Sequence, residues 1–134
     1  MTESHDFAPE PDAAAAPNAV VWAEIPVTDL ARGQAFYEAV LGVTMKAEQM
    51  GPNMAAVFPY AGGAGVSGHI YEGKPAGDGR GPTVSLLVTD DLTQVMERVW
   101  TAGGKVLGEV ITIPFGRFFY ATDPDGNSLS LFRV

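Results

Sequence analysis

The chain has 134 residues, of which 46% are hydrophobic and 18% charged, a balance typical of a single folded domain. The net charge is −8 and no basic stretch is present to neutralise phosphates, which argues against binding of nucleic acid. No apolar run approaches the about 18 residues that cross a bilayer, so we expect no membrane partner. The absence of cysteine excludes disulfides and thiol chemistry.

Residues 1–18 form an acidic segment that is broken by proline and rich in alanine, which predicts a disordered leader. The segment contains acidic side chains but no lysine or arginine. It has neither the basic start nor the apolar core of a secretory signal. We therefore expect a cytoplasmic protein whose folded part is a single domain over residues 19–134.

The first half of this domain reads as one strand, one helix and three further strands. The run VVWAEIPV from Val20 predicts a strand, and Asp29 is a typical N-cap for a helix over Leu30–Leu41. Gly42 then fits the position that ends a helix in the left-handed conformation. Further strands are predicted at residues 44–50, 54–59 and 66–71, with a glycine-rich turn at Gly62, Gly63 and Gly65 before the last of them.

The second half repeats this order after a linker at residues 72–82, which is dense in glycine and proline. A strand is predicted at Thr83–Val88, and Asp90 or Asp91 then caps a helix that Gly103 ends. The apolar residues of that helix follow helical spacing: Leu92, Val95, Met96 and Val99. The last strands are predicted at residues 105–113, 117–122 and 128–133, with an Asp-Gly turn at residues 123–127 before the final one.

The two halves are related by a shift of 61 residues, which indicates an internal duplication. The shift takes Val27-Thr28-Asp29 onto Val88-Thr89-Asp90 and Gly42 onto Gly103. Further pairs are Phe58 and Phe119, Gly65 and Gly126, Ser67 and Ser128, Ile70 and Leu131, and Tyr71 and Phe132. The predicted class is therefore α+β: two βαβββ modules, at about residues 19–71 and 83–134, forming a curved mixed-sheet cup with the helices outside. Such a concave surface suits a small-molecule ligand.

Two stretches resemble the vicinal oxygen chelate family, which includes glyoxalase I, the bleomycin-resistance proteins and ring-cleaving dioxygenases. The first is WAEIPVTDL at residues 22–30, followed by Ala35-Phe36-Tyr37 and Leu41-Gly42. The second is DPDGNSLSL at residues 123–131, which resembles the closing turn and strand of the family. The resemblance covers about residues 20–134. It implies the fold strongly and the reaction weakly, because many chemistries share this scaffold.

The resemblance also implies one metal ligand on the first and one on the last strand of each module, usually His or Glu. The corresponding positions here are Trp22, His69, Thr83 and Ser130. Only His69 is a competent ligand for a divalent cation, and a catalytic site needs two or three protein ligands. We therefore expect no metal cofactor. The alternative is a divalent metal held by Glu24, His69 and solvent.

Glu24 and His69 are the candidate catalytic residues. Glu24 follows Trp22 by two positions, so it faces the same side of its strand, into the cup. A carboxylate beneath an apolar rim takes up a proton more readily, and a neighbouring histidine can orient it or share that proton. The alternatives are a Glu24 that is solvated or paired with Arg117, and a His69 that serves only the structure.

The remaining candidates are expected to contact a ligand: Trp22, Thr83, Ser85, Arg117 and Ser130. Trp22 would stack on the ligand, and Arg117 would clamp an anionic group unless it forms a surface salt bridge.

The leading hypothesis is a homodimeric protein, similar to glyoxalase and the bleomycin-resistance proteins, that binds a small organic molecule without a metal. As an enzyme it would be a lyase or isomerase that moves a proton with Glu24 and His69. One alternative is a metal-dependent glyoxalase-like lyase or dioxygenase. Another is a non-catalytic protein that sequesters a ligand or antibiotic, with Trp22 stacking on it and Glu24 binding a cation.

Overall fold

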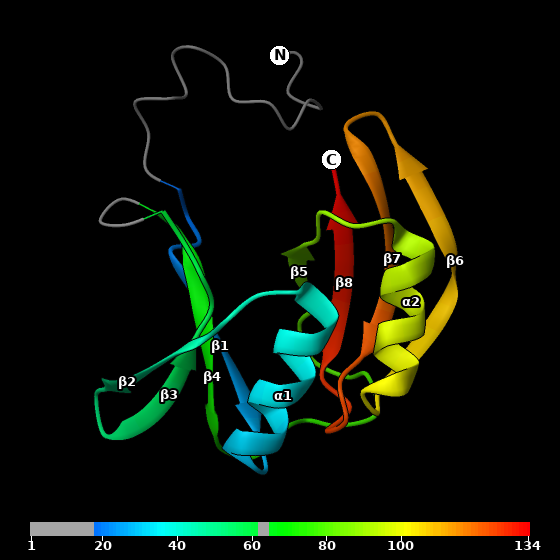
Figure 1. Cartoon of the computed structure of the whole chain (residues 1–134). Helices are drawn as coiled ribbons and strands as arrows, with labels where there is room; N and C mark the ends of the chain where they lie inside the picture. The colour runs from blue at the N-terminus through cyan, green and yellow to red at the C-terminus, as the bar shows by residue number, and fades with distance from the viewer. Residues whose placement is uncertain (1–17, 62–64) are drawn as a thin grey trace.

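Each half of the chain folds into one strand, one helix and three strands, as Figure 1 shows. The computed structural model describes residues 18–61 and 65–134. The first module contains β1 (Trp22–Val27), α1 (Leu30–Leu41), β2 (Lys46–Met50), β3 (Asn53–Val57) and β4 (Ser67–Glu72). The second contains β5 (Val84–Leu87), α2 (Leu92–Thr101), β6 (Lys105–Ile113), β7 (Gly116–Thr122) and β8 (Ser128–Arg133). The predicted leader, apart from Asn18, and the glycines at positions 62 and 63 lie outside the described residues. Neither described helix is long and apolar enough to cross a membrane.

The ends of α1 follow from the residues that flank it. Asp29 accepts a hydrogen bond from the Arg32 N–H at 2.9 Å, which satisfies one free donor of the first turn. Gly42 has φ 69° and donates its N–H to the Glu38 carbonyl, a left-handed end that suits glycine. Both predicted caps are confirmed. At α2, by contrast, Asp91 occupies the N-cap position without a side-chain hydrogen bond.

The strands form two four-stranded sheets, one from each module. Sheet A has the order β1-β4-β3-β2 and sheet B the order β5-β8-β7-β6. In each sheet the first strand of the module runs parallel to the last, and the other pairs are antiparallel. Glu24 pairs with His69 in sheet A, and Ser85 pairs with Ser130 in sheet B. The shift of 61 residues therefore relates β1 to β5 and β4 to β8 residue by residue. β3 and β7 are related by a shift of 63 instead, because Val57 pairs with His69 and Tyr120 pairs with Ser130.

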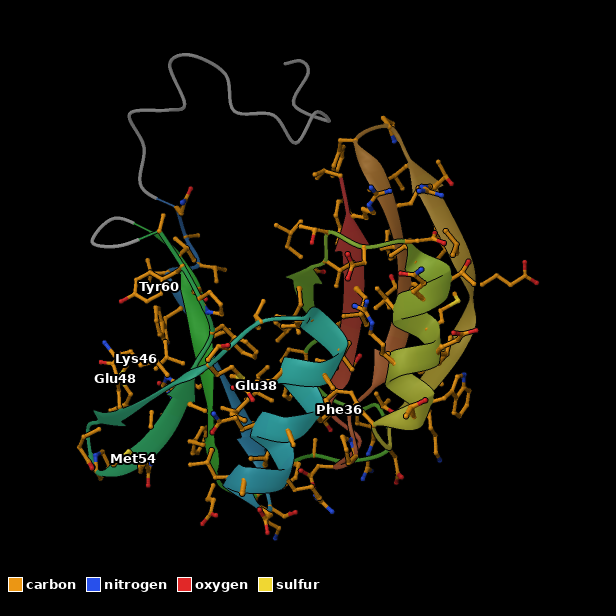
Figure 2. The ribbon with its side chains drawn as sticks, viewed as in Figure 1. Phe36, Glu38, Lys46, Glu48, Met54 and Tyr60 are labelled. Carbon is orange, nitrogen blue, oxygen red and sulfur yellow. The ribbon has the colours of Figure 1, made fainter. Side chains whose placement is uncertain are left out.

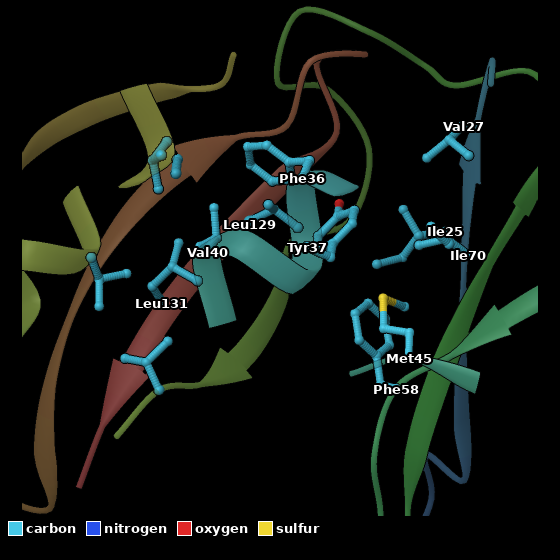
Figure 3. Packing of buried hydrophobic residues seen from close by; sticks show 14 of the residues in the cluster. Ile25, Val27, Phe36, Tyr37, Val40, Met45, Phe58, Ile70, Leu129 and Leu131 are labelled. Atoms are coloured by element: carbon cyan, nitrogen blue, oxygen red, sulfur yellow. The ribbon is translucent and has the colours of Figure 1, made fainter. Parts of the chain in front are cut away.

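One hydrophobic core lies between the sheets and around the helices. Ile25 and Ile70 of sheet A and Leu129 and Leu131 of sheet B belong to the same buried cluster, and Figure 3 shows them on opposite sides of α1. α1 contacts β3 and β4, α2 contacts β6 and β8, and the two helices contact each other. We call the face of each sheet that lies opposite its helix the open face.

The α+β class and the two βαβββ modules are confirmed, and each sheet has a helix on one face only. The two open faces, however, point away from each other within one chain, because the helix-covered faces share the core. Sheets A and B of one chain therefore cannot enclose a cup between their open faces. Such a cup would need the open face of sheet B from a second copy to lie opposite sheet A.

The turn before β8 joins the second module to the first. Asp123, which is 3% exposed, accepts a hydrogen bond of 2.6 Å from the Tyr37 hydroxyl on α1. The Asn127 side chain donates both to Asp123 and to the Pro26 carbonyl of β1. Asp125 accepts hydrogen bonds from the Thr28 N–H and hydroxyl. The predicted Asp-Gly turn is confirmed, and it also fixes the angle between the modules.

Alkaline pH should weaken these contacts between the modules because they include the Tyr37 hydroxyl. Burial raises the pKa of the Tyr37 phenol well above its ordinary value, and the nearby Asp123 carboxylate raises it further. In the unfolded chain a tyrosine ionises near pH 10, so above that pH the unfolded state loses a proton that the folded state keeps. Stability should therefore be fully present below about pH 10 and fall as the pH rises further. Urea unfolding between pH 8 and 11 should show a steeper fall for the wild type than for Tyr37→Phe, and equal slopes would contradict the assignment.

Candidate functional site

Side chains of β1 and β4 form a pocket on the open face of sheet A. Trp22 and Glu24 alternate with the buried Ile25, so both face away from the core. His69 is in register with Glu24 on the neighbouring strand. The pocket has a volume of about 660 Å³, and its wall is completed by Tyr60 and the β2–β3 turn at residues 49–53. Three of the predicted site residues, Trp22, Glu24 and His69, are therefore brought together.

The Trp22 and His69 side chains are joined by a hydrogen bond of 2.8 Å from the indole Nε1–H to the imidazole Nδ1. An indole nitrogen can only donate, so Nδ1 is the acceptor and the proton of the neutral imidazole is on Nε2. His69 is 5% exposed, and within the described part of the chain its Nε2–H has no hydrogen-bond partner. The site thus holds a buried donor for which the described residues supply no acceptor.

Aromatic rings surround that hydrogen bond. The Tyr60 ring meets Trp22 edge to face, with ring centroids 5.4 Å apart, and the Tyr71 ring meets His69 at 5.9 Å. Figure 2 shows Tyr60 on the side of sheet A away from α1. The role of Tyr60 in the site was not predicted. An aromatic residue just after a strand is equally compatible with a core position, so the sequence held no signal that could separate the two.

Glu24 lies beside His69 in the sheet, but no hydrogen bond joins the two side chains. Its carboxylate is exposed and forms no hydrogen bond or ion pair with any described residue. Arg117 does not reach it, because Arg117 lies on β7 of sheet B, in register with Arg133 and on the same face as the buried Phe119. The structure therefore forms neither the expected Glu24–His69 contact nor the alternative Glu24–Arg117 pair.

The equivalent positions on sheet B carry hydroxyl groups. Ser85 and Ser130 occupy the positions equivalent to Glu24 and His69, and their hydroxyls are 2.7 Å apart. The hydroxyls of Thr83 and Ser128 are 2.6 Å apart. Thr83, Ser85 and Ser130 thus lie together on the open face of sheet B, away from Glu24 of the same chain. Arg117 lies on the other face of that sheet.

The residues present do not fit the metal centre that the family resemblance implies. Of the four corresponding positions only His69 carries a ligand of the right kind, and its Nδ1 already accepts the Trp22 hydrogen bond. Within residues 18–61 and 65–134, no group of three or more His, Cys, Asp or Glu side chains is placed to hold a metal ion. Coordination through Nε2 would require the imidazole proton to move to Nδ1, where it would oppose the Trp22 N–H donor.

A second hollow, of about 740 Å³, lies between α1 and α2. Its two cationic side chains already have partners, because Arg32 pairs with Asp125 and Arg98 pairs with Asp90. None of the described residues that line this hollow is a buried polar group without a partner. We therefore regard the pocket beside Trp22 as the candidate site.

Comparison with known proteins agrees with this geometry. The structure is similar to a glyoxalase-related enzyme from Fulvimarina pelagi, with 19% identity, a TM-score of 0.61 and coverage of 88% of this chain and 89% of that one. It is also similar to a glyoxalase/bleomycin resistance protein from Albidiferax ferrireducens, with 20% identity, a TM-score of 0.57 and coverage of 87% and 99%. The protein described as oxidase ChaP-H2 shares 21% identity with a TM-score of 0.58, covering 87% and 94%.

At these identities the likeness concerns the fold alone. No curated protein gave a significant sequence match. The family model, in contrast, matches residues 19–131, which is nearly the whole described chain. The chain belongs to the Glyoxalase/Bleomycin resistance protein/Dioxygenase superfamily.

Proposed function

We propose that the protein binds a small organic cation in the pocket beside Trp22, without a metal ion. The observation that carries this proposal is that Trp22 stands where the family resemblance implies a metal ligand. Its indole N–H donates to His69 Nδ1. What remains in the pocket is one free carboxylate, from Glu24, among aromatic rings. A carboxylate among aromatic rings suits an organic cation, whereas a ligand bound through a metal ion would need the missing metal ligands.

The chemistry of the pocket walls favours an organic cation over an inorganic one. The faces of Trp and Tyr rings attract cations, and they do so best for weakly hydrated alkylammonium or pyridinium groups. A carboxylate beside them supplies the counter-charge. A flat cationic molecule would stack on Trp22 and place its charge near Glu24.

We propose that a second copy of the chain covers this pocket. The open face of sheet B carries apolar side chains that are exposed in one chain, among them Leu87, Leu107 and Tyr120. The rings of Phe118 and Phe132 stack there at 5.8 Å. Large exposed apolar faces of this kind mark interfaces. In a two-fold dimer, sheet B of one copy would lie over sheet A of the other, giving two equivalent cups.

Replacing Glu24 by glutamine should weaken binding of a cationic probe, 3-ethyl-1-methylpyridinium. Loss of one partly exposed ion pair of about 1 kcal/mol corresponds to about a five-fold rise in Kd. Isothermal titration calorimetry at 50 and 300 mM NaCl should also show that the wild type, but not Glu24→Gln, loses affinity with salt. Glu48→Gln is the matched control, since Glu48 lies on the same open face in β2 but does not line the pocket. Equal Kd values for the wild type and Glu24→Gln would refute the proposal.

The free carboxylate of Glu24 also supports a lyase or isomerase activity, in which it would remove a proton from the bound molecule. The same variant separates the two roles. If Glu24 is a base, the Glu24→Gln variant should lose turnover of any substrate found, while its Kd changes little. If Glu24 is only a charge partner, the variant should bind more weakly, while its turnover rate on bound substrate stays within a few-fold of the wild-type rate.

A further inference from the structure

The Nε2–H of His69 is the polar group that the proposed cation does not explain. His69 is 5% exposed, and Nδ1 is engaged by the Trp22 indole. Buried donors are nearly always paired, and those without a protein partner meet water, a ligand or another chain. The groups that face His69 are Glu24 on β1, Tyr71 on its own strand, Tyr60, and Lys46 on β2 in the same cross-strand row. None of them accepts from Nε2.

We infer that Trp22 is a positioning residue, which holds His69 as a hydrogen-bond donor, and that the ligand presents an acceptor atom to His69 Nε2. The indole N–H cannot accept, so neutral His69 keeps its hydrogen bond to Trp22 only while the proton stays on Nε2. The other tautomer would place two N–H donors against each other. Trp22 therefore fixes the polarity of His69 as well as forming an aromatic wall.

This assignment rests on the proposed function and narrows the ligand class. The ligand is a flat cation that also carries a carbonyl or similar neutral acceptor, with the charge near Glu24 and the acceptor near His69. A ligand without such an atom would leave the Nε2–H buried and unpaired, which lowers affinity. Sites that hydrogen-bond a ligand group discriminate strongly against analogues that lack it.

The tautomer can be tested without any ligand. The chain has two histidines, so the variant His5→Gln leaves His69 as the single source of imidazole signals. In ¹⁵N NMR spectra of the neutral imidazole, Nε2 should show the protonated resonance and Nδ1 the unprotonated one. In Trp22→Phe, which keeps an aromatic ring but removes the donor, the two resonances should move towards each other as the tautomers mix. A protonated Nδ1 in the wild-type ring, or spectra unchanged by Trp22→Phe, would overturn the role of Trp22.

The acceptor is tested with two probes that differ only in a carbonyl, 3-acetyl-1-methylpyridinium and 3-ethyl-1-methylpyridinium. Calorimetry should give about a five-fold lower Kd for the acetyl probe, as expected for one hydrogen bond to a buried donor. His69→Phe should reduce that ratio to about one while Glu24-dependent binding remains. A ratio of one in the wild type would overturn the acceptor role and assign Nε2–H to the second copy or to water. If neither probe binds, the cation proposal is wrong, and so is the acceptor proposal that depends on it. The tautomer of His69 is still decided by the NMR spectra.

Discussion

Replacing Asp123 by alanine should cost the protein about 4 kcal/mol of unfolding free energy, a large share of the 5–15 kcal/mol of a typical domain. The Asp123 carboxylate accepts from the Tyr37 hydroxyl, from the backbone N–H groups of Asp125 and Asn127, and from the Asn127 side chain. Alanine would leave the Tyr37 hydroxyl buried without a partner, and it would release the turn that joins the modules. Urea unfolding followed by circular dichroism measures the loss.

Asp91→Ala is the matched control, because it removes the same charge from an exposed position that makes no side-chain capping bond. Surface changes of this kind stay within about 0.5 kcal/mol. If the two variants unfolded at the same urea concentration, the contacts of Asp123 between the modules would not contribute to stability. A lower slope of unfolding free energy against urea in Asp123→Ala alone would indicate that the modules separate before they unfold.

Local signals explain why so many elements were predicted correctly. Asp29 and Gly42 act through contacts within a few residues, so the bounds of α1 could be read from the sequence. β2 begins at Lys46 rather than at residue 44, because the preceding Met45 N–H is used by the Glu38 carboxylate instead of a strand partner. That hydrogen bond spans a helix end and a loop, and no local pattern signals it.

The direction of the open faces could not be predicted for a related reason. A shift of 61 residues says that the modules are alike, but it leaves their relative orientation undetermined. That orientation depends on Tyr37, Asp123 and Asn127, whose contacts connect residues far apart in the chain. The same holds within the site. The sequence placed Trp22 and His69 on neighbouring strands, whereas the direction of their hydrogen bond depends on two side-chain conformations.

The double variant Leu87→Glu/Tyr120→Glu should turn the proposed dimer into a folded monomer and abolish binding of the pyridinium probes. Leu87 is 61% exposed and Tyr120 is 42% exposed in one chain. The change at Tyr120 removes its edge-to-face contact with Phe118 on the open face, whereas the buried core of the isolated fold stays intact. In the proposed dimer both side chains are buried over sheet A of the second copy, where Glu24 and Glu48 already carry negative charge. Each substitution occurs twice in a two-fold dimer, so a loss of about 1 kcal/mol at each of the four interface positions corresponds to a rise in the dimer dissociation constant of about several hundred-fold.

Sedimentation equilibrium over a range of concentrations, with circular dichroism to establish folding, decides the outcome. Trp100→Glu is the control, because Trp100 is 57% exposed on α2 and lies outside both open faces, so the change adds a charge without touching the cup. A double variant that remained dimeric would show that sheet B is not the covering surface. A folded monomer that still bound the probes with wild-type affinity would show that the pocket beside Trp22 is complete in one chain. Only joint loss of the dimer and of binding, with Trp100→Glu unaffected, fits a cup that is half built by each copy.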